Sequence, residues 1–141
     1  MDLICHPDES EKMHEYLLSI NEWFLQSLEI PYHVILKCSG DAGYFATSKQ
    51  YDFEAWLPFS KEFIELGTDT NARGYQAHRF NTKFKAGHGE TDFVHNVNDT
   101  GCAAGRTIVA ILENYQQQDG SVVVPKVLRP YMSGLEIISH R

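Results

Sequence analysis

The sequence predicts a single α+β domain in which an antiparallel sheet is flanked by helices. Three observations favour this class. A helix-spaced apolar pattern opens the chain, several short β-rich runs separated by turn residues follow it, and a second helical pattern comes after them. A classical dinucleotide-binding fold is disfavoured, because no Gly-x-Gly-x-x-Gly sequence joins a strand to a helix.

The composition predicts one folded domain. The chain has 141 residues, of which 43% are hydrophobic and 12% aromatic, which argues against disorder. Its formal net charge of -7 argues against a general nucleic-acid binder, since neutralising phosphates needs clustered Lys and Arg. Only Arg79, Lys83 and Lys85 form a mild concentration of cations. A nucleic-acid contact would therefore have to come from a local patch or from sequence outside these residues.

The cysteines and histidines suggest a reducing compartment without structural zinc. Cys5, Cys38 and Cys102 are isolated from one another, which gives no disulfide framework. The seven histidines show no ligand spacing with cysteines or acids. No apolar run reaches membrane-spanning length, and the N-terminus lacks the layout of a signal peptide. We therefore expect a cytoplasmic protein.

The first elements are a strand end and a long helix. Met1 to His6 reads as the end of a strand, and Pro7 to Ser10 supply a cap and first-turn acids for a helix start. We expect His14 and Asn21 to lie off the buried stripe of this helix, which runs for about five turns. The predicted stripe consists of Met13, Tyr16, Leu17, Ile20, Phe24 and Leu28.

Three strands and a turn are expected next. Tyr32 to Lys37 is rich in β-forming residues, and Ser39 to Gly43 is a turn cluster. Tyr51 to Leu57 alternates apolar and polar residues, which indicates a half-buried strand. Phe63 to Leu66 is predicted to pair antiparallel with it across the connection from Pro58 to Lys61.

These two strands carry acids on one face. Asp52 and Glu54 occupy the polar positions of the first strand, and Glu65 follows the same alternation in the second. An acid inside a strand needs solvent, a cation or a hydrogen bond. A solvated sheet face is the simpler interpretation, whereas acids that converge would suit Mg²⁺ bound together with a nucleotide.

The segment before the last helix is expected to alternate turns with short elements. Gly67 to Asn71 reads as a polar loop, and Tyr75 to Arg79 as one helical turn. Phe80 to Phe84 reads as a strand, Gly87 to Gly89 as a turn, and Thr91 to Asn98 as the returning strand.

The last helix is predicted from Gly101 to Gln118, before a β-branched run at Val122 to Val124. Arg106 lies one turn into it and off its apolar stripe, facing the junction between strand and helix. Gly101 and Gly105 lack a Cβ, which lets a backbone or a flat ligand approach closely. From spacing alone, an ordinary junction with a surface arginine remains the main alternative. The predicted stripe consists of Ala104, Ile108, Ile111, Leu112 and Tyr115.

Several blocks of sequence resemble one enzyme family. NDTGCAAGRTIVAILENYQQQDG, followed by VVVPKVLRPYMSGLEII, closely resembles the third signature motif of class II aminoacyl-tRNA synthetases and the C-terminal end of seryl-tRNA synthetases. LEIPYHVILKCSGDAGYFATSKQYDFEAWLP and QAHRFNTKF extend the resemblance, which covers the chain from about Glu9 onward. It implies that residues 1–141 form one domain, the C-terminal portion of a class II catalytic core.

The resemblance implies an ATP site. In the family, the stretch that matches FIELGTDTNARGYQAHR usually reads like YREISSCSNCTDFQARR. Its glutamate corresponds to Glu65, which is expected to bind ATP in part through Mg²⁺, and its second serine to Thr68, which keeps a hydroxyl for the metal or a phosphate. Leu66 and Gly67 are the neighbouring ATP-binding positions. Arg106 matches the arginine that packs on adenine and reaches the γ-phosphate.

The resemblance also implies a serine site and an activity. Thr100 falls where the family places a hydroxyl residue that contacts serine, and Asn98 is a polar partner beside it. The implied enzyme uses ATP and Mg²⁺ to activate serine and transfers it to tRNA as a homodimer, with Arg106 and Glu65 as catalytic residues. The resemblance begins after the family's second motif, so we expect these 141 residues alone to activate serine weakly or not at all.

Two alternatives remain open. The replaced GTDTN loop suits a non-catalytic paralogue or half-domain that binds a ligand or a protein. A synthetase-like ligase that loads an amino acid onto a carrier protein is the other alternative.

Overall fold

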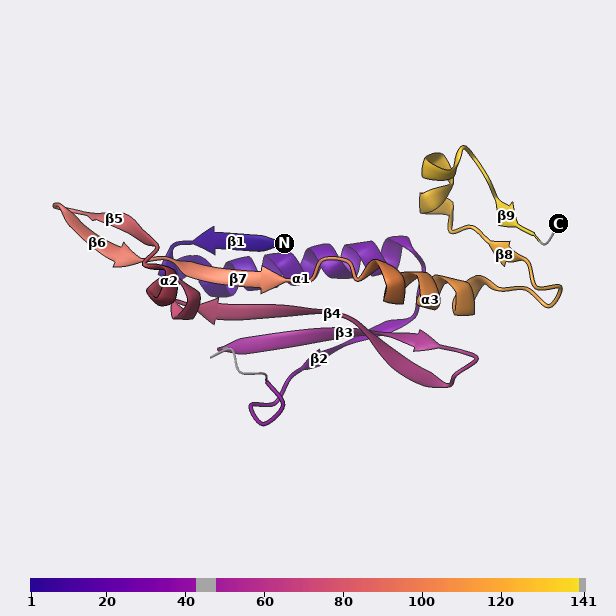
Figure 1. Cartoon of the computed structure of the whole chain (residues 1–141), viewed down its shortest axis with the longest axis horizontal. Helices are drawn as coiled ribbons and strands as arrows, with labels where there is room; N and C mark the ends of the chain where they lie inside the picture. Colours follow the sequence, from indigo (N-terminus) through magenta and orange to yellow (C-terminus); the bar gives the residue numbers. More distant parts are fainter. Residues whose placement is uncertain (43–47, 140–141) are drawn as a thin grey trace.

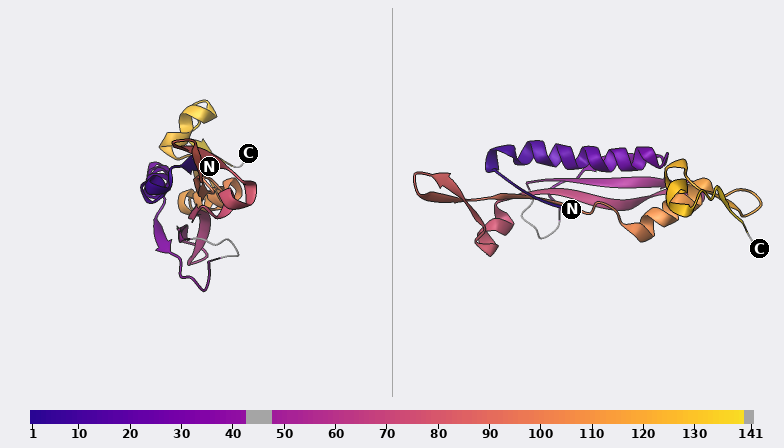
Figure 2. Two further views of the ribbon diagram at one scale, coloured as in Figure 1. Left: turned by 90° about the vertical axis from the view of Figure 1, so that its left-hand side faces the viewer. Right: turned by 90° about the horizontal axis from the view of Figure 1, so that it is seen from above.

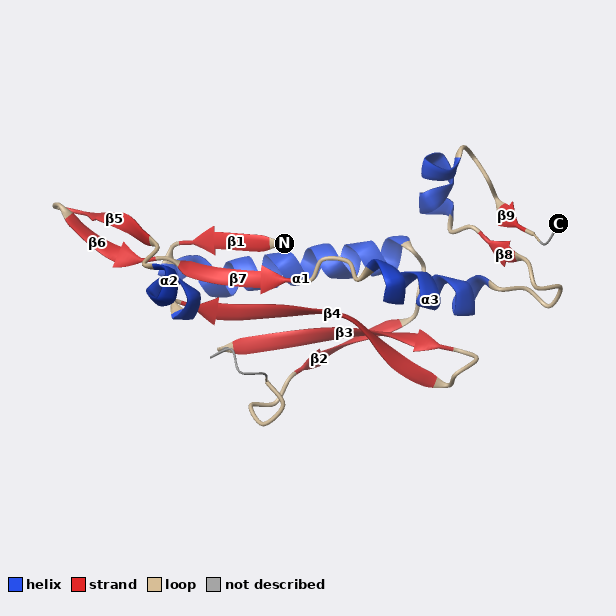
Figure 3. Cartoon of the chain, viewed as in Figure 1, coloured by secondary structure: helices blue, strands red, loops and turns tan. Residues whose placement is uncertain are grey.

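The computed structural model describes residues 1–42 and 48–139, and Figure 3 shows their helices and strands. The predicted turn at Ser39 to Gly43 therefore falls partly outside the described residues, because Gly43 is not among them. In chain order the elements are β1 (Asp2–Cys5), η1 (Pro7–Glu9), α1 (Ser10–Ser27), β2 (Tyr32–Leu36), β3 (Lys49–Leu57), β4 (Glu62–Arg73), α2 (Tyr75–Phe80), β5 (Lys83–Gly87), β6 (Glu90–Phe93), β7 (His95–Asp99), α3 (Ala104–Tyr115), β8 (Val122–Val123), η2 (Lys126–Met132) and β9 (Ile137–Ile138).

A five-stranded sheet in the order β1-β7-β4-β3-β2 is the centre of the molecule, and all its pairs are antiparallel. Helix α1 runs along one face of it (Figure 1, Figure 2). The core joins α1 to the alternate apolar residues of β3 and to α3, and its buried members are Leu25, Leu28, Ile30, Phe53, Ala55, Leu57, Leu66 and Ala110. The predicted α+β class with an antiparallel sheet and flanking helices is confirmed.

The buried face of α1 matches the predicted stripe only in part. His14 and Asn21 were expected to lie off it, yet both are buried, whereas Tyr16 is exposed. The reason is that the sheet beneath α1 offers polar partners. His14 Nε2 lies 3.1 Å from the Asp69 carbonyl oxygen, and Asn21 donates to Asp99 Oδ1 at 2.9 Å. A polar helix face is stable when its groups are paired across the interface.

The polar loop predicted at Gly67 to Asn71 is wrong, because β4 continues through it to Arg73. Thr68 pairs with Asp52 of β3, while Thr70 pairs with Asn98 of β7. Polar residues are tolerated in this central strand because one face meets the polar side of α1 and the other face is a solvent-accessible hollow.

Two boundaries before β7 also differ from the prediction. The strand predicted from Phe80 is displaced, because α2 extends to Phe80 and Asn81 ends it in a left-handed conformation. The strand predicted from Thr91 to Asn98 is interrupted at Val94, so that β6 pairs with β5 and β7 joins the large sheet. One long return strand is therefore two strands in two sheets.

Helix α3 is shorter than predicted, and only Ile111 and Tyr115 of its predicted stripe pack against the core. Gly101 has φ +69, outside the helical range, and Gln116 is extended. Thr107 and Ala110 are the buried residues, while Ile108 is 55% exposed and Leu112 is 44% exposed. Their side chains instead line an apolar groove of about 340 Å³ with the C-terminal segment, formed by Ile108, Ile111, Leu112, Val122, Val123, Val124, Pro125, Leu128, Met132 and Ile138.

Candidate active site

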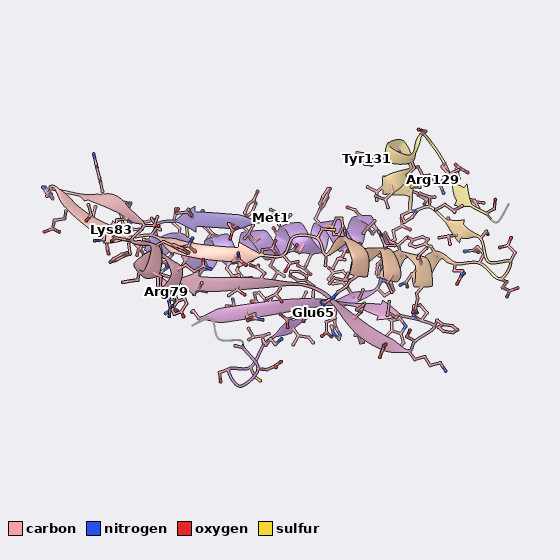
Figure 4. The ribbon with its side chains drawn as sticks, viewed as in Figure 1. Met1, Glu65, Arg79, Lys83, Arg129 and Tyr131 are labelled. Carbon is pink, nitrogen blue, oxygen red and sulfur yellow. The ribbon has the colours of Figure 1, made fainter. Side chains whose placement is uncertain are left out.

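An arginine and a glutamate from different elements meet at the start of α3. Arg106 Nη1 donates to the Glu65 carbonyl oxygen at 2.9 Å and to Glu65 Oε1 at 3.1 Å. The two side chains are 53% and 39% exposed, and Figure 4 labels Glu65 near the middle of the molecule. The structure thus brings together the two residues that the sequence predicted to share a site.

A β-bulge decides which β4 residues share a face. Glu65 and Thr68 are three residues apart, a spacing that puts side chains on opposite faces of a regular strand. However, Glu54 pairs with Glu65 and Asp52 pairs with Thr68, so the register shifts by one residue at Leu66. Asp52 and Glu54 lie on one face of β3, so Glu65 and Thr68 lie on that face too.

Leu66 and Gly67, the other predicted ATP-binding positions, place no side chain on the face that Glu65 and Thr68 share. Leu66 is buried in the core, and Gly67 packs against Phe53. A Cβ on Gly67 would lie 2.7 Å from Phe53 Cε2, which accounts for glycine where the family pattern has serine. Contacts from these two positions to a ligand would be made by the backbone.

A hollow of about 360 Å³ adjoins Thr68 on the face that α1 does not cover. Thr68 and Thr100 fix each other, because the Thr100 amide donates to the Thr68 carbonyl at 2.9 Å and the Thr68 amide donates to Thr100 Oγ1 at 3.2 Å. Asn98 also donates to Asp2 of β1. The hollow is lined by Gln50, Thr68, Thr70, Ala72, Gln76, Asn98 and Thr100.

The hollow therefore includes three predicted residues, Thr68, Asn98 and Thr100, and four that the sequence did not single out. Glu65 and Arg106 are not among its lining residues. Gly105, which was expected to admit a close neighbour, faces open space, since no heavy atom lies within 4 Å of a Cβ placed there.

Asp52 organises a polar network beside Thr68. Its carboxylate accepts hydrogen bonds from Lys37 Nζ at 2.6 Å, from Thr68 Oγ1 at 2.8 Å and from Gln50 Nε2 at 3.1 Å. Burial by itself would raise the pKa of Asp52, but these hydrogen bonds outweigh burial and lower it. Asp52 is thus an ionised acceptor that orients the Thr68 hydroxyl.

The sequence identified Asp52 only as one acid on a polar strand face. The signal for Lys37 was weaker still, because it lies fifteen residues away and the pairing of β2 with β3 brings it close. Glu54 is likewise paired, with His33 Nε2 at 2.7 Å. The acids of this face are therefore neither simply solvated nor converging on one point.

The donors available for a metal suit one that is shared with a ligand. Residues 1–42 and 48–139 hold no group of three His, Cys, Asp or Glu side chains arranged to bind a metal ion. Mg²⁺ is usually held by one or two carboxylates together with substrate phosphates. Glu65 and Thr68 supply a carboxylate and a hydroxyl on one face, and this oxygen donor set fits such an ion.

A buried acid pair lies on the opposite face, under α1. Asp69 and Asp99 are direct partners on β4 and β7, and both are buried. Burial, and next the Asp99 carboxylate, raise the pKa of Asp69 to about 8, and burial also raises the pKa of Asp99. Four buried side-chain atoms here have no hydrogen-bond partner among the described residues. They are both carboxylate oxygens of Asp69, Oδ2 of Asp99 and Nδ1 of His14.

Comparison with known proteins decides the family. Residues 1–115 match the family described as "tRNA synthetase class II core domain (G, H, P, S and T)". The chain belongs to the class II tRNA synthetase core-domain family. Within the class II core, the match ends at the last residue of α3.

Curated relatives of this class II core are named serine–tRNA ligases. The protein of Dictyoglomus thermophilum is 50% identical over 135 residues, which cover 96% of this chain and 32% of that protein. The protein of Azoarcus sp. is 48% identical over 135 residues, or 96% of this chain and 31% of that protein. This class II chain therefore spans about a third of the length of the curated relatives it matches.

Solved structures agree with the class II assignment. The seryl-tRNA synthetase of Pyrococcus horikoshii complexed with ATP superposes with a TM-score of 0.94 at 41% identity, covering 99% of this chain and 31% of that one. The serine–tRNA ligase of Naegleria fowleri in complex with AMP gives a TM-score of 0.91 at 36% identity, covering 99% and 34%. In the part of the class II chain that is described, no helix is both long and apolar enough to cross a membrane.

Proposed function

We propose that this chain forms the ATP- and serine-binding part of a serine–tRNA ligase. One observation carries the proposal. Arg106 contacts Glu65, and Glu65 shares one face of β4 with Thr68. Thr68 in turn lines a hollow together with Asn98 and Thr100. A nucleotide and a small hydroxyl amino acid are the ligands that such neighbouring groups suit, and the names of the relatives support this pairing.

ATP is proposed to bind at the Arg106 end. The planar guanidinium suits both stacking on adenine and pairing with a γ-phosphate. Its present partner is Glu65, and an exposed ion pair contributes only about 0–1 kcal/mol, so exchanging it for a phosphate costs little. Glu65 and Thr68 would hold Mg²⁺, which when bound supplies positive charge to the phosphates. Leu66 and Gly67 would offer only backbone groups.

Serine is proposed to bind in the hollow. Thr100 is held by two hydrogen bonds to Thr68, so its side chain has a fixed place beside Asn98. Paired polar groups of this kind discriminate against an analogue that lacks the hydroxyl, because they are then left unpaired. Thr100 and Asn98 thus select the substrate side chain.

For the whole protein we propose the complete reaction. The serine carboxylate attacks the α-phosphate of ATP and pyrophosphate leaves. A hydroxyl at the 3′ end of the tRNA then attacks the carbonyl carbon of the seryl-adenylate, an ester forms, and AMP leaves. Such catalysis depends on alignment and charge stabilisation, to which Arg106 contributes a fixed cation. We further propose that the whole protein acts as a homodimer in the cytoplasm, where isolated thiols such as Cys38 and Cys102 stay reduced.

Calorimetric titration of the 141-residue chain with a non-hydrolysable seryl-adenylate analogue tests this function. We expect saturable binding, and binding at least about 10-fold weaker for the alanyl analogue, which lacks the hydroxyl. Equal affinity for the two analogues would remove the assignment of Thr100 and Asn98. Absence of binding to either at millimolar concentration would contradict the proposed function.

A further inference from the structure

The β5–β6 hairpin stands apart from the large sheet. Its strands form a separate two-stranded sheet, and Figure 1 shows it projecting beyond the end of β4 and β7, next to α2. Gly87 and Gly89 at its tip have positive φ values, as a tight turn requires. Every residue from Lys85 to Asp92 is exposed. The hairpin therefore offers both of its faces to solvent over most of its length.

The charges of the hairpin separate onto its two faces. Lys83 pairs with Phe93 and Lys85 pairs with Thr91, and directly paired residues share one face. Phe84 pairs with Asp92, so this acid lies on the opposite face. The face that carries Lys83 and Lys85 is thus cationic, because the residues paired with these two lysines are not acids.

Helix α2 extends this cationic face. The ring of His78 stacks on Phe93 with centroids 3.9 Å apart, which joins the helix to the hairpin. Arg79 follows directly and lies over the Tyr75 ring at 4.4 Å, and Figure 4 labels both Arg79 and Lys83 at this end of the molecule. Arg79, Lys83 and Lys85 together are called the hairpin cation surface.

These three cations have no acidic partner, unlike most others. Within residues 1–42 and 48–139, Arg79, Lys83 and Lys85 form no ion pair. The cations that do form ion pairs with carboxylates are Lys37, Lys49, Arg73, Arg106 and Arg129. The segment from Gly74 to Phe93 has three cations against two acids, whereas the whole chain has a net charge of -7. An anionic partner would therefore be attracted to this end and repelled elsewhere.

We propose that the hairpin cation surface binds the phosphate backbone of an RNA strand whose 3′ end enters the hollow beside Thr100. The proposal rests on the proposed function, since an acceptor RNA must reach the same hollow as serine. Gln76 lines the hollow and lies one turn before Arg79 on α2, so the surface and the hollow are adjacent. Phe80 is 79% exposed at this end and is available for base stacking.

Fluorescence anisotropy with a labelled serine tRNA transcript tests the surface. In the 141-residue chain, the double variant Lys83→Glu, Lys85→Glu reverses two of its charges. The matched control, Lys61→Glu, Lys126→Glu, makes the same change in net charge in the β3–β4 turn and at the start of η2, the end away from the hairpin in Figure 1. Lys61 and Lys126 are exposed and also lack ion pairs among the described residues.

At 50 mM salt we expect the hairpin variant to bind the tRNA at least about 10-fold more weakly than the unmodified chain. The affinity of the control variant should fall by less than about 2-fold. The neutral variant Lys83→Gln, Lys85→Gln should lower the slope of log affinity against log salt by about 2, since each phosphate contact contributes about 1. Equal losses in hairpin variant and control, or no binding by the unmodified chain, would overturn the proposal.

Two further measurements separate this proposal from others. Circular dichroism melting reports whether each variant folds, and the neutral variant serves where charge reversal unfolds the hairpin. Titration with the seryl-adenylate analogue should be unchanged in the hairpin variants, because none of the substituted residues lines the hollow. Analogue binding without tRNA binding would overturn the hairpin surface while leaving the proposed function standing.

Discussion

The ion pair between Arg106 and Glu65 contributes little to the stability of the fold. Both side chains remain substantially exposed, and their contact is one ion pair with one added bond to a backbone carbonyl. Exposed pairs contribute about 0–1 kcal/mol to stability. A structural role therefore accounts poorly for a cation held at this junction.

Arg106→Ala separates binding from stability. We expect seryl-adenylate analogue affinity to fall at least about 10-fold, while the melting temperature falls by no more than about 4 °C. Calorimetric titration and thermal melting measure the two. Arg129→Ala is the matched control, since Arg129 also pairs with a glutamate, Glu136, but in the C-terminal segment. A proportionate loss of stability and affinity would identify Arg106 as a structural residue.

Asp69 has the opposite character, because it is fully buried and its pKa is raised to about 8 from an ordinary 3.8. Between those values the folded chain keeps a proton that the unfolded chain has lost. The free energy of unfolding contributed by Asp69 therefore falls as pH rises from about 4 to about 8. His14 acts at the acidic side, since burial lowers its pKa and folding then disfavours its charged form.

Asp69→Asn should remove the alkaline part of this dependence. The amide cannot ionise, so we expect the variant to be more stable than the unmodified chain by roughly 1–3 kcal/mol at pH 8 and similar to it at pH 4. Urea denaturation at both pH values measures the difference, and comparison at each pH cancels the contribution of His14. A difference that is the same at pH 4 and pH 8 would contradict the assignment.

The strand β4 shows how one small residue allows a larger neighbour. Gly67 leaves the space that the Phe53 ring occupies, and a Cβ would also come within 3.0 Å of Thr100 Cβ. The bulge at Leu66 then lets Glu65 and Thr68 share a face. The residues at position 67 of β4 and position 53 of β3 must therefore fit each other where β4 presents the candidate site.

Gly67→Ser, which restores the residue of the family pattern, should destabilise the chain by roughly 1–3 kcal/mol through overpacking. Phe53→Leu in the same chain should recover part of that loss, although Phe53→Leu alone leaves a cavity and is also destabilising. A double-mutant cycle of urea denaturation measures the coupling. Strictly additive effects would show that Gly67 and Phe53 do not compete for space.

Periodicity located the helices but only part of their buried faces, since Leu17 and Leu28 are buried and Ile111 and Tyr115 pack against the core as predicted. In α1 it favoured the side with Tyr16, because hydrophobicity alone cannot show that His14 and Asn21 find partners on the sheet. In α3 it favoured Ile108 and Leu112, which are apolar yet face a groove instead of the sheet core. The pattern identifies a buried face correctly only when the surface opposite it is apolar.

For the chain as a whole, the fold class and the meeting of Arg106 with Glu65 were predictable, since they follow from motif resemblance and strand order. The hydrogen-bond network that orients the Thr68 hydroxyl was not predictable. Lys37 directly follows β2 and Asp52 lies on β3, and no local sequence pattern predicts their contact. The length of β4 was also missed, because polar residues in a central strand depend on what covers each face.

The apolar groove between α3 and the C-terminal segment should make the isolated chain self-associate. All its lining residues are apolar, and exposed apolar patches of this kind promote association. We expect sedimentation velocity to show a concentration-dependent increase in mass, which Ile108→Asp reduces. Trp23→Gln, at an exposed aromatic residue on α1, should leave it unchanged. A chain that stays monomeric above 100 μM, roughly, would contradict this expectation.

The pairing of β1 with β7 has a consequence for biosynthesis. Asp2 pairs with Asn98 and Cys5 with His95, so β1 finds its partner only after the residues between β1 and β7 have been made. During translation, β1 must wait on the ribosome while the β2–β3–β4 meander is already able to assemble. Contacts so distant in sequence slow folding and leave strand edges exposed in the nascent polypeptide, where chaperones act.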